Sequence, residues 1–237
     1  MSNRAPVYHN PEFDRYADDY DRALQQGLSV SGESKDYFAE GRVAWLGGCL
    51  AKRSFAPGRI LDFGCGTGSS TPHLLTLPQA ESVTGVEVSP QSIKVAEKTH
   101  GSARARFYLS SEFLPVGHMD LAFCNGVFHH IPLSERIGAV TYVRDCLRPG
   151  GCFALWENNP WNPGTRYVMS RIPFDQDAIT LSCLETQRLL RAGGFEVLRT
   201  DFLFIFPRAL KFLRPLESLL TRWPLGAQYQ VLARRPE

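Results

Sequence analysis

The 237-residue sequence has few of the features that mark secreted, metal-binding or membrane-spanning proteins. Its six cysteines form no C-x-x-C pair and no zinc-ligand spacing, so we expect free thiols in a reducing cytosol and no metal site. Residues 1–10 contain no apolar segment of a signal peptide, and no run of about eighteen apolar residues occurs. These absences predict a soluble cytoplasmic protein without a transmembrane segment.

An excess of charge of one sign is also lacking. The 26 basic and 24 acidic residues give a formal net charge of +2, which provides no bulk electrostatic field for nucleic acid. No G-x-S-x-G sequence is present, which argues against a serine hydrolase of the nucleophile-elbow type. With 43% hydrophobic residues, the chain is long enough for one large domain with a full core.

The most informative segment is residues 60–70, which combine a strand, a tight turn and a helix start. An apolar run ends in Asp62, and glycines then occupy every second position before Ser69 and Ser70. Glycine has no Cβ, so the turn can adopt positive φ and bring bare backbone against a ligand. The following helix directs its free N–H groups and its positive dipole end at the same place. The glycines are Gly64, Gly66 and Gly68.

The spacing of these glycines distinguishes two classes of ligand. A dinucleotide fingerprint is G-x-G-x-x-G, in which the helix N-terminus meets a pyrophosphate. Here the spacing is G-x-G-x-G, and Ser69 occupies the place of the third glycine. Asp62, just before the turn, would repel a pyrophosphate and attract an α-ammonium or a sulfonium. The motif resembles the S-adenosylmethionine loop of class I methyltransferases, and both features disfavour the alternative, a nicotinamide-dependent oxidoreductase.

Strand-like apolar runs alternate with helical patterns after a helical region at residues 10–55, which predicts βαβ units and a parallel sheet. In such sheets ligands bind beyond the carboxyl ends of the strands, where the polar residues of the motifs lie. Strands are expected at Arg59–Phe63, Val83–Val88, Arg106–Leu109, Asp120–Asn125, Cys152–Glu157, Phe195–Phe206 and Gln228–Ala233. Later helices are expected at Pro90–Thr99, Pro132–Leu147 and Leu184–Arg191.

Further segments resemble one branch of the methyltransferase family, the ubiquinone and menaquinone biosynthesis C-methyltransferases. These segments are residues 13–21, 85–90, 114–115, 120–130 and 148–151. The resemblance covers residues 13–195 and implies an α/β, Rossmann-like fold: a seven-stranded, mostly parallel sheet with helices on both faces and an antiparallel last strand. We expect a single domain, 1–237, with an N-terminal helical lid at 1–55, a cofactor-binding core at 56–157, and an acceptor-side half at 158–237 with insertions at 158–180 and 207–224.

The cofactor implied by this resemblance is S-adenosyl-L-methionine. Asp62 and the three glycines would hold its methionine part, Glu87 would accept both ribose hydroxyls, and the Asn125 carbonyl would accept from the α-ammonium. Tyr20 of the lid would reach the methionine carboxylate or the methyl group, unless it is a half-buried tyrosine of an amphipathic helix. The cofactor-binding residues expected in all are Tyr20, Asp62, Gly64, Cys65, Gly66, Gly68, Glu87, Val88, Ser110, Ser111, Glu112 and Asn125.

One segment departs from the pattern of that branch. After its third strand the branch has Asp-Ala-Glu-x-Leu-Pro, whose Asp accepts from the adenine amino group, whereas residues 110–115 read Ser-Ser-Glu-Phe-Leu-Pro. Ser110 can accept only a neutral hydrogen bond, roughly half as strong as a charge-assisted one. Either Glu112 contacts the adenine or adenine binding is weaker here, and Phe113 either stacks on the ring or belongs to the core.

Methyl transfer from a sulfonium is an in-line displacement, and an aliphatic hydroxyl acceptor also needs a general base. His129 and His130 lie just past the fourth strand and titrate near neutrality, so one of them is expected to act as base or to orient the acceptor. Glu157 is the third candidate catalytic residue, and we expect it and Asn158 to point into the acceptor cleft. The aromatic residues expected to wall this cleft, unless they are buried structural residues, are Trp161, Tyr167 and Phe174.

The sequence therefore predicts methylation of a small molecule, with a binding module of the same fold as the alternative. Asn159-Pro160-Trp161 resembles the DNA adenine methyltransferase motif, but it follows the wrong strand and lacks the second proline. Asp120 begins the fourth strand instead of ending it, which disfavours a magnesium-assisted catechol mechanism. Residues 202–222 mix apolar and basic side chains, so they either form a packed helix or contact the acceptor or a lipid surface. In the latter case we expect an aromatic or lipid-like acceptor; the methylated element and the oligomeric state stay open.

Overall fold

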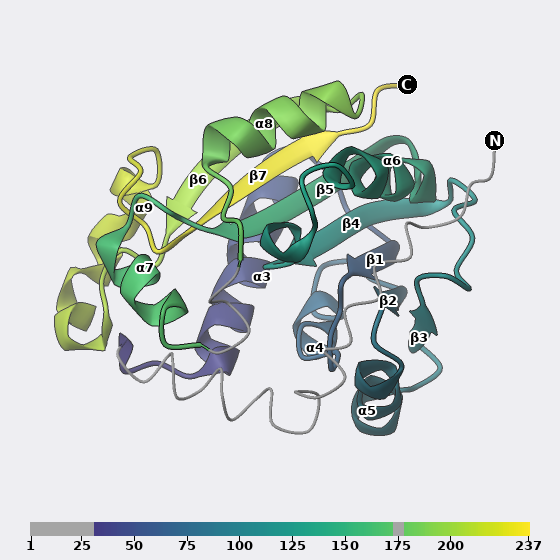
Figure 1. Cartoon of the computed structure of the whole chain (residues 1–237), viewed down its shortest axis with the longest axis horizontal. Coiled ribbons are helices and arrows are strands. Elements are labelled where there is room, and N and C mark those ends of the chain that lie inside the picture. The colour runs from purple at the N-terminus through teal and green to yellow at the C-terminus, as the bar shows by residue number, and fades with distance from the viewer. Residues whose placement is uncertain (1–30, 173–177) are drawn as a thin grey trace.

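The computed structural model describes residues 31–172 and 178–237. Within them a seven-stranded sheet has the order β3-β2-β1-β4-β5-β7-β6, with helices on both of its faces (Figure 1). All neighbours are parallel except β7, which pairs antiparallel with both β5 and β6. The predicted fold class is confirmed. The strands are β1 Arg59–Phe63, β2 Ser82–Glu87, β3 Ala105–Leu109, β4 Met119–Asn125, β5 Leu147–Asn158, β6 Glu196–Leu203 and β7 Gln228–Arg234.

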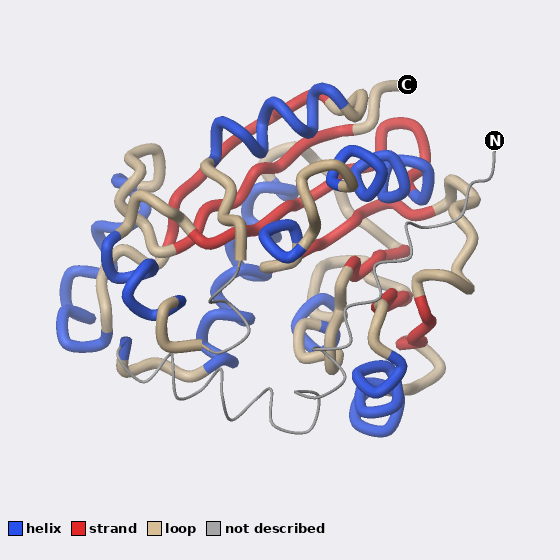
Figure 2. Tube along the Cα trace, in the orientation of Figure 1, coloured by secondary structure: helices blue, strands red, loops and turns tan. Residues whose placement is uncertain are grey.

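Helix α3 precedes the first strand, and the other described helices lie in the connections between strands (Figure 2). Serine side chains cap three of them: Ser34, Ser89 and Ser182 accept from backbone N–H groups of the first turns of α3, α5 and α8. No helix in the described ranges is long and apolar enough to cross a bilayer. The helices are α3 Lys35–Ala51, α4 Thr71–Leu74, α5 Pro90–His100, η2 Phe128–His130, α6 Arg136–Cys146, α7 Pro163–Met169, α8 Cys183–Ala192, η4 Arg208–Leu216 and α9 Glu217–Leu220.

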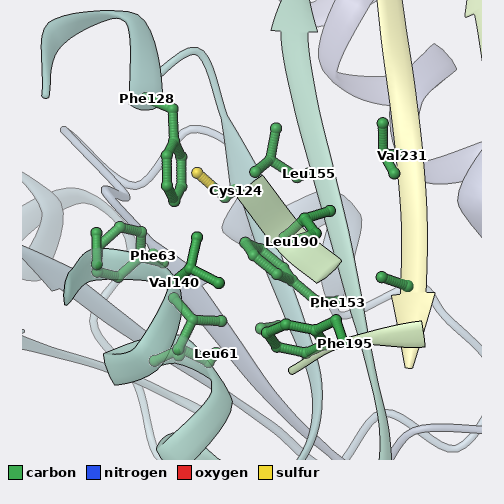
Figure 3. Packing of buried hydrophobic residues seen from close by; sticks show 14 of the residues in the cluster. Leu61, Phe63, Cys124, Phe128, Val140, Phe153, Leu155, Leu190, Phe195 and Val231 are labelled. Atoms are coloured by element: carbon green, nitrogen blue, oxygen red, sulfur yellow. The ribbon is translucent and has the colours of Figure 1, made fainter. Parts of the chain in front are cut away.

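Two apolar clusters cover the two faces of the sheet. On one face, α6 and α8 pack over Leu61, Phe153 and Leu155, as Figure 3 shows. On the other, α3 and α4 pack over Ile60 and Trp156. Successive strand residues point to opposite faces, so Leu61 belongs to one cluster and Ile60 to the other. The carboxyl ends of β1, β4 and β5 lie between these layers and are held in place by both.

Several predicted boundaries differ from the structure. The helix expected from Pro132 begins only at Arg136, because residues 128–130 first form the turn η2 and the Arg136 side chain binds the Ile131 carbonyl. The sixth strand ends at Leu203, since Phe204 has a φ of 62° that breaks extended backbone. The insertion at 158–180 contains α7. The packed-helix interpretation of residues 202–222 is wrong, because η4 and α9 contain no buried residue.

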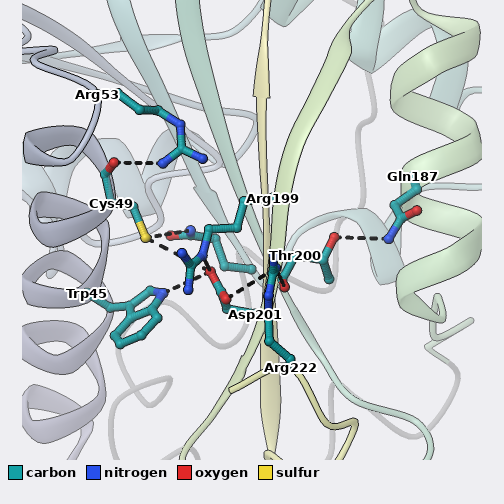
Figure 4. Close-up of polar contacts among 9 residues, drawn as sticks. Trp45, Cys49, Arg53, Gln187, Arg199, Thr200, Asp201 and Arg222 are labelled. Atoms are coloured by element: carbon teal, nitrogen blue, oxygen red, sulfur yellow. Dashed lines mark hydrogen bonds and ion pairs between the residues drawn. The ribbon is translucent and has the colours of Figure 1, made fainter. Parts of the chain in front are cut away.

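A buried carboxylate fixes helix α3 to the sheet (Figure 4). Asp201 of β6 is fully buried and accepts hydrogen bonds from Trp45 Nε1 of α3, at 3.2 Å, and from Arg199 Nε. The Cys49 thiol, also on α3, lies 3.9 Å from the same carboxylate oxygen. Burial and the nearby Asp201 charge raise the pKa of Cys49, so this thiol stays protonated. The network sets the position of α3, one turn of which faces the cavity described below.

Part of the predicted lid and two predicted site residues lie outside the described residues. Of the lid at 1–55, only residues 31–55 are described. Tyr20 and Phe174 fall in the ranges 1–30 and 173–177, which are not described.

Candidate active site

A cavity of about 440 Å³ opens beyond the carboxyl ends of β1, β4 and β5. Its walls are the glycine loop after β1, the start of α3, the helix α7, and residues 204–207. This is the position at which open α/β sheets bind their ligands. The sequence motif at 60–70 and the end of the fourth strand therefore meet at one site.

The glycine loop has the conformation that its sequence predicts. Gly64, Gly66 and Gly68 have φ of +69°, +52° and +80°, which L side chains rarely adopt. A Cβ at Gly66 would meet no atom within 4 Å, so this residue offers bare backbone to open space in the cavity. A Cβ at Gly64 would lie 2.3 Å from Val127 Cγ2, so this glycine is needed for packing.

Asp62 and Asn125 present hydrogen-bond acceptors to the cavity. Asp62 pairs with Phe123 across β1 and β4, which places Asn125 slightly further along on the same face. Asp62 Oδ2 and Asn125 Oδ1 are buried and accept no hydrogen bond from the described residues. Burial and the charge of Glu87 raise the pKa of Asp62 to about 7, and Arg42 opposes this shift. Two buried acceptors without a donor fit an ammonium group, which carries three N–H donors.

Arg42 is a cavity residue that the sequence analysis did not identify. It lies on α3, is 7% exposed, and its guanidinium donates to Gln228 Oε1 at 3.0 Å. Gln228 Nε2 in turn donates to Asn158 Oδ1 at 3.2 Å. An arginine at a buried helix position, between Ala39 and Val43, is the one signal that could have indicated it. This buried cation can hold a carboxylate beside the two acceptors.

The Glu87 carboxylate holds the glycine loop by hydrogen bonds to backbone N–H groups. One carboxylate oxygen accepts from Gly66 N at 3.0 Å, and the other accepts from Val88 N at 2.7 Å and from Ser89 N at 3.2 Å. Glu87 does not line the 440 Å³ cavity. The carboxylate is therefore placed at the second strand end, as predicted, and it fixes the loop whose backbone faces the cavity.

The segment after β3 also lies apart from the cavity lining. Ser110 is buried, whereas Ser111 and Glu112 are exposed. Phe113 packs against the core cluster under α6, and its carbonyl accepts from Tyr142 Oη. Of the two alternatives for Phe113, the structure supports a place in the core.

His129 forms a buried pair with Glu157. His129 Nδ1 lies 2.6 Å from Glu157 Oε2, while Glu157 Oε1 accepts from the backbone N–H of Phe128. His129 and His130 both line the cavity, with ring centroids 4.0 Å apart. Glu157 does not point into the cavity as expected, because it and Asn158 are successive residues of β5 and face opposite sides of the sheet. Asn158 lines the cavity, and Glu157 lies behind His129.

Two of the aromatic residues expected in the cavity wall, Trp161 and Tyr167, lie elsewhere, and the aromatic residues that line the cavity in the described chain are Tyr37, Phe38, Phe204 and Phe206. Trp161 and Tyr167 are 49% and 48% exposed and do not line it. Helix α7 instead contributes small and aliphatic side chains, Thr165, Val168 and Met169. Asn159 holds the loop between β5 and α7, because its side chain donates to the Pro224 and Gly226 carbonyls. The acceptor side of the cavity is thus apolar along α7 and polar near His129.

Comparison with family models gives one match. Residues 61–153 match the model described as "Methyltransferase domain". The matched range runs from β1 into β5 and includes the glycine loop, Asn125 and the two histidines.

Two curated relatives illustrate the range of similar proteins. The O-methyltransferase cnsE of Penicillium expansum is 28% identical over 145 residues, which cover 59% of this chain and 52% of the relative. A trans-aconitate 2-methyltransferase of Rhodopseudomonas palustris is 30% identical over 122 residues, covering 51% and 46%. The chain thus spans about half the length of the curated relatives it matches.

Among solved structures, the plantazolicin methyltransferase BamL, in complex with a triazolic desmethylPZN analog and SAH, has a similar fold. The TM-score is 0.62 at 18% identity, and the match covers 95% of this chain and 100% of that one. At this identity the likeness concerns the fold.

Proposed function

We propose that this chain, which belongs to the class I S-adenosylmethionine-dependent methyltransferases through its domain at residues 61–153, transfers a methyl group to a small-molecule acceptor. The observation that carries the proposal is the pair of buried acceptors, Asp62 Oδ2 and Asn125 Oδ1, beside the open backbone at Gly66. A pyrophosphate has no donor for these atoms, whereas an amino acid ammonium has three. The pair therefore favours S-adenosylmethionine over a dinucleotide.

Different residues of the cavity bind different parts of the cofactor. Asp62 and Asn125 accept from its α-ammonium, and Arg42 holds its carboxylate. Gly66 leaves room for the chain between the amino acid and the sugar. The ribose contact of Glu87 stays a prediction, since its carboxylate accepts from the N–H groups of Gly66, Val88 and Ser89 and does not line the cavity. When bound, the sulfonium supplies an electrophilic methyl group.

His129 is the base that we assign to the acceptor side. Hydrogen bonding of Nδ1 to Glu157 holds the imidazole in the tautomer whose Nε2 carries the basic lone pair. An acceptor hydroxyl against Nε2 passes its proton to His129 as its oxygen takes the methyl group, and Glu157 stabilises the resulting imidazolium. The naming of relatives as O-methyltransferases supports a hydroxyl or carboxyl acceptor. The resemblance to the ubiquinone and menaquinone branch stays a prediction.

Calorimetry and product analysis test this function. We expect the protein to bind S-adenosylmethionine and its demethylated product, and not NADH. We also expect methyl-labelled cofactor to yield labelled small molecules in cell extracts, detected by mass spectrometry. Tight binding of NADH without binding of S-adenosylmethionine would contradict the assignment of S-adenosylmethionine as the cofactor. Binding of S-adenosylmethionine without any labelled product across extracts would indicate a binding module instead of an enzyme.

A further inference from the structure

Residues 208–225 form an exposed surface that we call the basic–apolar segment. It comprises η4, α9 and the turn that follows, and it lies at one end of the molecule, beyond α7 (Figure 1). Its large apolar side chains are among the most exposed of the described residues: Phe212 is 72% exposed, Leu219 75% and Trp223 63%. Leu210, Leu216 and Leu225 add a further 40–50% exposure each. Six large apolar side chains exposed within eighteen residues of chain favour an interaction surface.

The charges of the segment have one predominant sign. It contains four basic residues and one acidic residue, Glu217, whose carboxylate accepts from Phe206 N. Arg214 is turned towards the cavity, where it binds Glu33. Arg208, Lys211 and Arg222 are exposed. Arg208 also donates to the Gly32 carbonyl, and Arg222 donates to the Thr200 carbonyl and lies 3.7 Å from Asp201 Oδ1. The segment therefore combines exposed aromatic and aliphatic groups with an excess of cationic side chains.

We propose that the basic–apolar segment docks this protein on an anionic lipid bilayer. Cationic side chains that flank Phe, Trp and Leu are the composition with which amphipathic segments lie in the headgroup region of membranes. A second copy of the chain fits less well. In a two-fold dimer the same patch faces itself, so Arg208 and Lys211 would be brought against the same cations of the other copy.

Docking in this way brings one wall of the cavity close to the membrane. The residues that precede the segment, Phe204–Pro207, line the cavity, and so does Arg214 within it. The wall of the cavity and the membrane-facing segment are thus one continuous stretch of chain. The inference does not depend on the proposed function, because vesicle binding is measured without cofactor or acceptor.

Sedimentation with vesicles tests the inference. Wild-type protein is expected to sediment with vesicles of phosphatidylcholine plus phosphatidylglycerol, and to stay in solution with phosphatidylcholine alone. Arg208→Gln with Lys211→Gln should lower the partition coefficient by about tenfold or more, since each cation near an anionic surface is worth about 1 kcal/mol. Phe212→Ser with Leu219→Ser and Trp223→Ser should abolish sedimentation. The matched control replaces three exposed apolar residues outside the segment, Leu114→Ser, Val116→Ser and Leu133→Ser, and should bind like wild type.

A second measurement locates the contact. Acyl chains carrying bromine should quench the fluorescence of the wild-type protein, and Trp223→Phe should remove most of this quenching while sedimentation persists. The inference is overturned if wild type ignores anionic vesicles or if the control triple variant loses binding as the segment variant does. It is also overturned if wild type is a dimer that the Phe212→Ser, Leu219→Ser, Trp223→Ser variant converts to monomer without any vesicle binding. Circular dichroism melting of each variant verifies that it is folded.

Discussion

At the scale of single residues, Asp62 carries the most information about the ligand. Its carboxyl is buried with one oxygen that accepts nothing from the described residues, and its pKa is raised to about 7 by burial and by Glu87. The carboxyl is therefore only partly ionised at neutral pH in the ligand-free protein. A ligand ammonium supplies a cation and favours the ionised form.

This gives a pH dependence for cofactor binding. Because Asp62 is largely ionised above pH 7 and largely protonated below it, S-adenosylmethionine should bind roughly tenfold more weakly at about pH 6 than at about pH 8. Calorimetry at both pH values measures the effect. The Asp62→Asn variant should bind S-adenosylmethionine weakly at both pH values. If this variant keeps the pH dependence of wild type, the titrating group is not Asp62.

The same raised pKa affects the stability of the ligand-free protein. The folded state retains the Asp62 proton between about pH 4 and about pH 7, whereas the unfolded chain loses it near pH 4. The contribution to stability is therefore fully present below pH 4 and is lost as the pH rises through 7. Cofactor binding and folding thus respond to pH in opposite directions in this window.

Two neighbouring glycines should respond differently to substitution. Gly66→Val directs its side chain into the open cavity, so we expect loss of cofactor binding with a stability loss of only about 1–2 kcal/mol from the positive φ. Gly64→Ala should instead destabilise the fold by a further 1–3 kcal/mol, roughly, because its Cβ would overlap Val127. Urea unfolding and calorimetry separate the two effects. Val127→Ala should recover the part of the stability of Gly64→Ala that is lost to the overlap, while the strain of the positive φ persists, and should leave Gly66→Val unable to bind.

The proposed base is testable through His129. His129→Gln should lower kcat by roughly 100- to 10,000-fold, because no side chain then takes the proton of the acceptor. His130→Gln, the matched control, should keep most of kcat. Turnover of an identified acceptor at saturating S-adenosylmethionine provides the comparison. Equal losses in the two variants would leave His129 only an orienting role.

At the scale of elements, helix α3 joins the site to the far part of the sheet. It carries Arg42 into the cavity and is held at Asp201 by Trp45. Asp201→Ala removes an acceptor that is fully buried and leaves the Arg199 guanidinium without its partner. We expect a loss of about 3 kcal/mol in the free energy of unfolding.

Denaturant unfolding measures this loss, and Trp45→Phe should give a smaller one, about 1 kcal/mol, for one hydrogen bond. Glu196→Gln on the same strand is the control. Glu196 pairs with Arg234 in solvent, with both side chains about half exposed, so no measurable change is expected. If Asp201→Ala behaves like Glu196→Gln, the carboxylate does not anchor α3.

The sequence predicts some elements better than others for physical reasons. Arg59–Phe63 is predicted to the residue because the apolar run ends at Gly64, whose positive φ ends the extended backbone. Arg42 was not identified: its place on the apolar face of the helix, beside Ala39 and Val43, is visible in the sequence, but only tertiary contacts show that this face borders the cavity. Glu157 was expected in the cleft although strand alternation already places it opposite Asn158, so that signal was available in the sequence. The exposure of residues 208–225 depends on what packs against them, which local composition does not determine.

At the scale of the whole molecule, the site is assembled from parts that are distant in the sequence. Arg42 comes from α3, Asp62 and Asn125 from the central strands, and Gln228 from β7. A ligand that bridges them stabilises the folded state as a unit. S-adenosylmethionine at about 100 times its Kd should add about 2.7 kcal/mol and raise Tm by roughly 5–10 °C.

Differential scanning fluorimetry measures this shift. NADH at the same concentration should leave Tm unchanged, and Asp62→Asn should reduce the shift given by S-adenosylmethionine. A similar shift in Tm with NADH and with S-adenosylmethionine would mean that the cavity does not discriminate between them.

The position of β7 in the sheet has a consequence for folding during translation. This strand inserts between β5 and β6, so both strands keep an open edge until residues 228–234 have left the ribosome. Gln228, which supports Arg42, arrives with the same strand. A nascent chain that ends before residue 228 therefore has the glycine loop but neither a complete sheet nor a complete ligand pocket. It is most prone to aberrant association just before β7 is translated.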